Sequence, residues 1–252
     1  MQPIWIVGGT SEGVAIASLL SAEGLSWIAT VTTSRATGRY RELAGRVESI
    51  VLTQDTAIAW ATDRHIAAIV DASHPFATQI SRLATATARE LFIPYLRYER
   101  PAISLRPETI LLDTFGELLH PHYLENRRVL LTTGIKTLSL FRDWHERSHL
   151  FARILPTRSS REAAIAAGFP PDRLVEQQLP STRQNELKLW RSLDIDTVVT
   201  KAAGKEGGLD IKQAVARELG VKSIAIARPA IDYPKQTSQF SEVLAFCQQV
   251  AN

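Results

Sequence analysis

The sequence predicts an α/β fold of two domains, each built around a mostly parallel β-sheet. Short apolar runs rich in β-branched residues alternate along the chain with runs of helical spacing, the pattern of parallel strands joined by helices. A strand, a turn containing glycine and a helix occur at 3–20 and again at 128–144, so the chain divides into two similar halves. We expect one domain at 1–100 and another at 101–252. Packing of the last helix, within 237–252, back on the first domain is left as an alternative.

In the first half, apolar and β-branched runs predict the strands, and longer runs of helical spacing predict the helices. The expected strands lie at 3–7, 27–33, 48–52, 66–71 and 94–98. The expected helices lie at 14–20, 56–64 and 78–91. A stretch rich in proline and arginine, 100–107, follows and is interpreted as a connector.

The second half continues the alternation. Strands are expected at 129–131, 151–155, 174–178, 197–201 and 223–227. Helices are expected at 136–144, 161–167, 185–193, 209–219 and 242–250. A further helical stretch at 113–124 is interrupted by His120-Pro121-His122, which we interpret as a surface turn and not as a metal site.

The composition favours a cytoplasmic protein with a small acidic substrate. A chain of 252 residues buries enough surface to fold without a disulfide or a metal. The single cysteine, Cys247, excludes an intramolecular disulfide and a cysteine-based metal cluster, and no metal site is expected. No signal peptide or membrane-spanning run is recognisable, so we expect no membrane partner. The net charge of +3 is too diffuse to indicate nucleic acid.

The first turn carries the clearest functional signal. Gly8, Gly9, Thr10, Ser11, Glu12 and Gly13 lie between an apolar strand and a helix, the opening of a dinucleotide-binding unit. Turn glycines let the backbone approach a pyrophosphate, and the helix directs N–H groups toward that anion. The pattern is G-G-T-x-x-G and departs from G-x-G-x-x-G, so an ordinary strand-to-helix turn is the alternative.

A basic stretch follows the second expected strand. Where NAD is preferred, an acidic residue usually stands there and binds the ribose 2′-hydroxyl. This chain has Ser34, Arg35 and Arg39 instead, and its nearest acid is Glu42. Guanidinium groups bind phosphate through paired hydrogen bonds, so the stretch favours the 2′-phosphate of NADP, with a solvated basic loop as the alternative.

Two further strand ends carry polar groups. His74 follows the expected strand 66–71, where catalytic and ligand groups of open α/β sheets collect. The stretch from Lys201 to Gly208 is a strand end, a glycine-rich loop and a helix start, which suits an anion. A structural histidine and a flexible turn are the respective alternatives.

Seven stretches together resemble the precorrin-6A reductases, nearly from end to end: Gly8–Glu12, Asp71–Ala77, Tyr95–Pro101, Thr132–Gly134, Leu155–Thr157, Lys201–Gly208 and Ile226–Pro229. Ser73 stands where the family usually has threonine, and the hydroxyl is kept. The resemblance implies two Rossmann-like domains with the active site in the cleft between them. It implies NADPH-dependent reduction of one ring double bond of precorrin-6A, or of its cobalt-containing counterpart, to the 6B product in cobalamin biosynthesis.

On this basis we assign the candidate residues to three roles. The cofactor-binding residues are Gly8, Gly9, Thr10, Ser11, Glu12, Ser34, Arg35, Arg39, Ser73, His74, Phe76, Gly204, Gly207 and Gly208. The residues that bind the carboxylates of the tetrapyrrole are Arg97, Arg100, Thr133, Lys205 and Arg228. The proton donor is left open between Lys201, His74, Tyr98 and water, with Lys201 favoured because its strand end is expected to face the cleft.

Two other classes of protein remain open. A reductase or epimerase of the extended short-chain type would need a Tyr-x-x-x-Lys pair on a helix, and the sequence has none. A regulatory protein that senses the nucleotide would bind NADP without chemistry.

Overall fold

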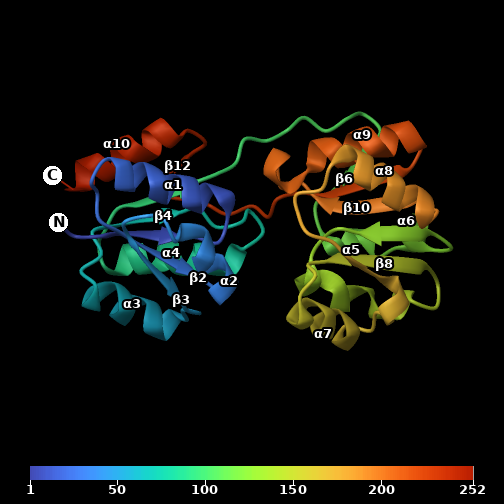
Figure 1. Ribbon diagram of the computed structural model, residues 1–252, viewed down its shortest axis with the longest axis horizontal. Coiled ribbons are helices and arrows are strands. Elements are labelled where there is room, and N and C mark those ends of the chain that lie inside the picture. Colours follow the sequence, from blue (N-terminus) through green and yellow to red (C-terminus); the bar gives the residue numbers. More distant parts are fainter. Residues whose placement is uncertain (252) are drawn as a thin grey trace. The chain divides into compact units, whose positions relative to one another are not determined.

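The computed structural model describes residues 1–251 and divides the chain into two compact units (Figure 1). Unit 1 comprises Met1–Pro101 and the chain from Pro229 onward, and unit 2 comprises Ala102–Arg228. The end of the chain thus differs from the expected division at 101–252. It lies in unit 1 because β12, Gln236–Thr237, pairs with β5, Tyr95–Tyr98, and because the last helix packs on the first.

Unit 1 is a six-stranded parallel sheet covered by helices on both faces, in the order β12-β5-β4-β1-β2-β3. Helices α1 and α10 contribute apolar residues to the core on one face, and α3 and α4 do so on the other (Figure 1). The remaining strands are β1 (Ile4–Val7), β2 (Trp27–Val31), β3 (Arg46–Ser49) and β4 (Ala68–Asp71). The helices are α1 (Ser11–Ala22), α2 (Ser34–Thr37), the 3-10 helix η1 (Gly38–Tyr40), α3 (Gln54–Asp63), α4 (Thr78–Glu90) and α10 (Phe240–Ala251).

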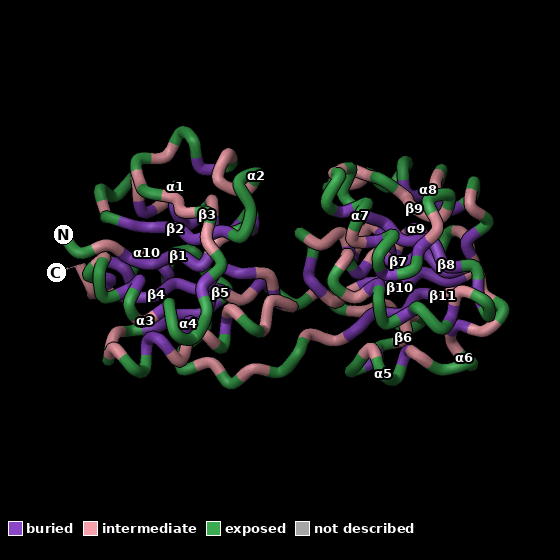
Figure 2. Tube along the Cα trace, turned by 90° about the horizontal axis from the view of Figure 1, so that it is seen from below, coloured by how far each residue is buried: buried purple, intermediate pink, exposed green. Residues whose placement is uncertain are grey.

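Unit 2 repeats this arrangement with a second six-stranded parallel sheet, in the order β6-β11-β10-β7-β8-β9. Figure 2 shows the buried residues following the strands of each sheet. The strands are β6 (Thr109–Leu112), β7 (Arg128–Leu131), β8 (His149–Ile154), β9 (Leu174–Glu176), β10 (Thr197–Lys201) and β11 (Lys222–Ile226). The helices are α5 (Phe115–Leu118), α6 (Pro121–Leu124), η2 (Ile135–Trp144), α7 (Arg158–Ala166), η3 (Pro171–Arg173), α8 (Arg183–Ser192), η4 (Lys205–Gly207) and α9 (Leu209–Leu219).

Each sheet reverses its strand order between its two central strands, β1 and β4 in unit 1 and β7 and β10 in unit 2. In unit 1 the chain runs from β1 outward to β3 and then returns to β4 on the other side of β1. In unit 2 it runs from β7 outward to β9 and returns to β10. Such a reversal leaves a crevice at the carboxyl ends of the two central strands, where open α/β sheets bind their ligands. The two places to search are therefore the ends of β1 and β4 and the ends of β7 and β10.

The predicted α/β class with mostly parallel sheets is confirmed, and the differences concern short elements. Strands β6 and β12 were not expected, because β6 follows the proline-rich connector and β12 has only two residues. The expected helix at 113–124 is two separate turns of helix, α5 and α6, with Pro121 at the first position of α6. Strand β2 ends at Val31 because the Thr33 side chain caps α2 by accepting a hydrogen bond from the Ala36 N–H.

The packing of Gly45 gives a stability prediction. A Cβ at this position would overlap the indole of Trp27, which is buried in the core of unit 1. We expect Gly45→Ala to lower the free energy of unfolding by about 1–3 kcal/mol, because the ring must shift. The control is Gly116→Ala in α5, whose added Cβ would lie 3.5 Å from the Thr114 hydroxyl. Urea unfolding of both variants checks this, and equal stabilities would show that the ring has room to move.

Candidate functional site

The glycine turn lies between β1 and α1, at the point where the strand order of unit 1 reverses. Gly9 has a φ of +98°, a conformation that favours glycine, and a Cβ there would meet no atom within 4 Å. Thr10 caps α1, since its Oγ1 accepts from the Gly13 N–H at 3.1 Å and donates to the Ala72 carbonyl at 2.7 Å. The Thr10 proton is therefore used within the fold, whereas Gly9 is exposed and has open space where a side chain would stand.

Tyr40 also reaches this turn, and the sequence analysis missed it. Its hydroxyl oxygen accepts a hydrogen bond from the Gly9 N–H at 3.4 Å. A Cβ on Gly8 would stand 2.5 Å from the same hydroxyl, and one on Gly13 would stand 2.9 Å away. The only sequence signal was an aromatic residue beside Arg39, and nothing in its spacing marked it as a neighbour of the turn.

The basic stretch folds back on the turn. Ser34 and Arg35 lie in α2, Arg39 lies in η1, and all three are exposed. The Arg39 guanidinium donates to the Gly9 carbonyl at 3.5 Å, a long contact at the surface. The structure thus places Arg39 beside the glycine turn.

The end of β4 is held by a buried network. Asp71, which is fully buried, accepts hydrogen bonds from the Ser73 N–H, the Tyr95 hydroxyl and Arg97, each at 2.9 Å. Beyond it, the Nδ1 of His74 accepts from the Phe76 N–H at 3.2 Å. A neutral His74 therefore carries its proton on Nε2. The network fixes the segment that carries Ser73, His74 and Phe76 next to the glycine turn.

Two arginines that we expected to bind substrate carboxylates have buried partners instead. Arg97 is fully buried, forms an ion pair with Asp71 and donates to Glu99 and Ser73. Arg100 forms a buried ion pair with Glu12. These guanidinium groups neutralise internal carboxylates, and an alternating strand pattern does not reveal such pairing.

Glu12, which we expected at the cofactor, is one half of this buried pair. Burial raises its pKa, but hydrogen bonding to Arg100 and the charge of Arg100 outweigh burial and hold the pKa below its usual value. Tyr98, a candidate proton donor, is also buried, and its ring stacks on Phe240 with centroids 4.6 Å apart. We interpret both as parts of the interior of unit 1.

In unit 2 the ends of β7 and β10 bring a threonine and two lysines together. Thr133 is buried and shares a hydrogen bond with Thr137 at 2.8 Å. Lys201 ends β10, and burial together with the nearby Lys136 lowers its pKa to about 8. Lys136, in the first turn of η2, was missed by the sequence analysis because it lies far from Lys201 in the chain.

The loop after β10 is an ordered glycine turn. Gly204 and Gly208 have φ values of +86° and +66°. The N–H groups of Gly207 and Gly208 donate within the loop, and the buried Lys212 ammonium donates to the Gly207 carbonyl at 2.5 Å. Lys205 in η4 is exposed, and the Arg228 guanidinium donates to the Ala202 carbonyl at 2.8 Å. The loop therefore has a defined shape, with Lys205 on its exposed side.

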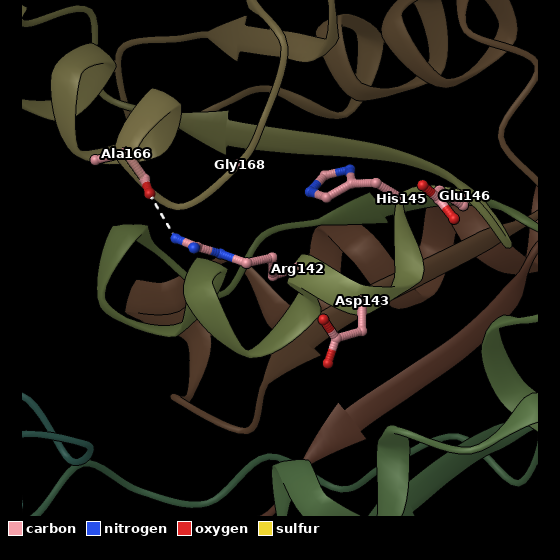
Figure 3. A pocket seen from close by; sticks show the side chains of 6 residues that line it. All are labelled: Arg142, Asp143, His145, Glu146, Ala166 and Gly168. Carbon is pink, nitrogen blue, oxygen red and sulfur yellow. Dashed lines mark hydrogen bonds between the residues drawn. The ribbon is translucent and has the colours of Figure 1, made fainter.

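A separate hollow of about 540 Å³ in unit 2 contains none of the predicted residues. Figure 3 shows Arg142 reaching the Ala166 carbonyl, at 2.8 Å, while Asp143 points away from it. These residues end η2 and α7, which lead into the next strands, so the hollow lies at the amino edge of the sheet. Ligands of open α/β sheets bind at the opposite edge, so we do not assign the function here.

Within residues 1–251, no helix has the length and apolar character needed to cross a membrane. The same residues contain no group of three or more histidine, cysteine, aspartate or glutamate side chains placed to hold a metal ion.

A glycine turn at the reversal of strand order, followed by an arginine that folds back on it, is typical of nucleotide-binding α/β proteins. Comparison with known proteins then identifies the family. Residues 3–248 match the family model of precorrin-6x reductase CbiJ/CobK. The chain belongs to this family and is an oxidoreductase of the precorrin-6A reductase type.

Individual relatives agree with this assignment. A cobalt-precorrin-6A reductase from Synechocystis sp. is 41% identical, over 99% of this chain and 97% of the relative. A cobalt-precorrin-6A reductase from Priestia megaterium is 33% identical, over 96% of each chain. Among solved structures, a CobK precorrin-6A reductase is similar in fold, with a TM-score of 0.78, 23% identity and coverage of 99% of this chain and 97% of the other.

The buried pair of Glu12 and Arg100 gives a prediction for acid stability. Because the folded-state pKa of Glu12 lies below its unfolded value of about 4.5, its ionised form stabilises the fold above that pH, and the contribution is lost as the pH falls. We expect Glu12→Gln to lower the free energy of unfolding by about 3–5 kcal/mol near pH 7, since the buried Arg100 loses the charge of the Glu12 carboxylate, and to weaken the loss of stability at acid pH.

Denaturant unfolding between pH 3 and pH 7 measures this effect. The control is Glu125→Gln, whose pair with Arg147 is about two-fifths exposed and should contribute less than about 1 kcal/mol. Equal losses in the two variants would contradict a buried role for Glu12.

Proposed function

We propose that this protein is an NADPH-dependent precorrin-6A reductase, which reduces one ring double bond of precorrin-6A, or of its cobalt-containing counterpart, to the 6B product. One observation supports the proposal above the others. In a chain of this family, the glycine turn lies where the strand order reverses, and an arginine from the segment after β2 contacts that turn.

The residues of unit 1 fit a dinucleotide. The open backbone at Gly9 and the N-terminus of α1 suit a pyrophosphate, with Ser11 beside them. Arg39 contacts this turn, Arg35 is exposed in α2 of the same segment, and both suit a 2′-phosphate. We assign Ser73, His74 and Phe76 to the remainder of the cofactor, because the network at Asp71 fixes their segment beside the turn. When bound, NADPH supplies the hydride, and the protein supplies binding and orientation.

Unit 2 suits the acidic tetrapyrrole. Lys201 and Lys136 lie together at the reversal point, and Lys205 is exposed on the ordered glycine loop. These cations suit acetate and propionate carboxylates, with Thr133 and Arg228 in the neighbouring strand ends. Gly204, Gly207 and Gly208 shape the loop around either ligand. Arg97 and Arg100 are left out of this set because both are buried in ion pairs. The names of both relatives favour the cobalt-containing substrate.

Lys201 is our choice of proton donor. A general acid works best when its pKa lies near the working pH, and the pKa of Lys201 is lowered to about 8. His74 is the second choice, as a donor through Nε2. Tyr98 is the weakest candidate for the proton donor, because its side chain is buried away from a bound tetrapyrrole ring.

The experiment that tests this function follows NADPH absorbance on addition of the tetrapyrrole, metal-free or loaded with cobalt. Consumption of NADPH with either substrate supports a reductase, and the faster substrate identifies the natural one. Binding of NADPH without consumption of either substrate would instead indicate a protein that only senses the nucleotide.

The arginines after β2 predict the choice of coenzyme. In Arg35→Ala and Arg39→Ala we expect NADPH affinity to fall by about one to two decades for each charge-assisted contact, while NADH affinity is unchanged. The control is Arg41→Ala, an exposed arginine of the same segment. Fluorescence titration with both coenzymes measures the ratio, and a ratio that stays at its wild-type value would refute the assignment.

Lys201 predicts a pH dependence of turnover. Since Lys201 is protonated below its pKa of about 8, we expect kcat to fall above that pH in the wild type. Lys201→Ala should lower kcat by about 100-fold or more and remove this limb, whereas Lys205→Ala should raise KM for the tetrapyrrole with kcat intact. A raised KM with a normal kcat in Lys201→Ala would show that Lys201 only binds a carboxylate.

A further inference from the structure

We propose that Tyr40 is a positioning residue of the cofactor site, whose hydroxyl holds the Gly9 peptide in the orientation that receives the pyrophosphate. This inference rests on the proposed NADPH-dependent function and extends it to a residue outside the glycine motif. In this role Tyr40 maintains the conformation of the turn and does not recognise the 2′-phosphate.

The Tyr40 hydroxyl occupies the space that side chains on Gly8 and Gly13 would need, since it lies 2.5 Å and 2.9 Å from where their Cβ atoms would stand. By contrast, a Cβ on Gly9 would meet nothing within 4 Å. Gly8 and Gly13 thus leave room for the Tyr40 phenol. Gly9 is the glycine of this turn that has free space beside it for a ligand.

Hydrogen bonds also hold the peptide groups of Gly9. Consecutive residues hold both sides of Gly9, since its N–H donates to the Tyr40 hydroxyl at 3.4 Å and its carbonyl accepts from Arg39 at 3.5 Å. Gly9 needs such support because glycine has few steric restrictions. Without hydrogen bonds it could leave its φ of +98° at little steric cost. The Arg39 contact is exposed and available for exchange with a phosphate, whereas Tyr40 is 2% exposed and stays in place.

The phenol of Tyr40 is anchored in the core of unit 1. The Tyr40 ring lies in the core of unit 1 beside Trp27, with centroids 6.1 Å apart, and the Tyr40 carbonyl accepts from the Leu43 N–H at 3.0 Å. Burial raises the pKa of Tyr40 above its usual value, an effect only partly opposed by the Gly9 N–H and Arg39. The phenol therefore stays neutral in the physiological range and its position is set by the core.

The first experiment removes the hydroxyl and keeps the ring. The turn receives the pyrophosphate common to both coenzymes, so Tyr40→Phe should raise the dissociation constants for NADPH and NADH by the same factor, about 3- to 10-fold. Their ratio should stay at the wild-type value, which separates this role from that of Arg39. The matched control is Tyr123→Phe, which removes the hydroxyl of a partly buried tyrosine in α6 of unit 2 and should leave both constants unchanged.

The second experiment tests the steric argument. In Gly8→Ala the new methyl group should displace the Tyr40 hydroxyl and weaken the binding of both coenzymes. Without that hydroxyl, the nearest atoms to the methyl group are the Thr30 carbonyl oxygen at 3.3 Å and the ring carbon Cζ at 3.5 Å. The double variant Gly8→Ala with Tyr40→Phe should therefore lose less coenzyme affinity than the sum of the losses in the two single variants. Circular dichroism checks that each variant is folded.

Three results would overturn the inference: a changed NADPH to NADH ratio in Tyr40→Phe, affinities equal to or tighter than wild type, or strictly additive effects in the double variant. A wild-type protein that binds neither coenzyme would overturn the proposed function and this inference with it. Normal wild-type binding with an unaffected Tyr40→Phe would overturn the inference alone.

Discussion

The reversal of strand order between the two central strands of each sheet is the constraint on which the rest of the structure depends. Because β4 returns to the side of β1 opposite β2, the connections after β1 and β4 leave the sheet of unit 1 toward opposite faces. The same holds for β7 and β10 in unit 2. The carboxyl ends of these strands are therefore left uncovered, and each unit carries its glycine-containing turn, its lysines or its histidine there.

A threonine hydroxyl ties the two central strands together in each unit. Thr10 donates to the Ala72 carbonyl at 2.7 Å, and Thr132 donates to the Val199 carbonyl at 2.9 Å. In both cases the threonine follows the earlier of the two central strands, β1 or β7, and the acceptor lies in or just after the strand that pairs with it across the reversal. Thr10, which was expected at the cofactor, and Thr132 thus use their hydroxyl protons within the fold.

The buried charges follow from the same need to fix the strand ends. Arg97 lies in β5 and Arg100 just after it, and they neutralise Asp71 and Glu12, which lie on the segments that form the candidate site. In unit 2 the buried Arg153 pairs with Glu186. Removing either member of such a pair leaves a charge without compensation in the interior, so these pairs constrain the segments that carry them. Sequence position alone does not separate such an arginine from one that binds substrate, because both kinds stand at strand ends.

The sequence by itself determined the fold class, the family and the order of the principal strands and helices, because hydrophobic periodicity and turn glycines are local properties of the chain. Only the tertiary structure decided which groups share one place. It brought Tyr40 into the glycine turn, set Lys136 beside Lys201, and buried Arg97 and Arg100 in ion pairs. The physical reason is that burial and charge pairing depend on contacts between segments far apart in the chain. The local sequence pattern does not show which strand ends lie next to one another.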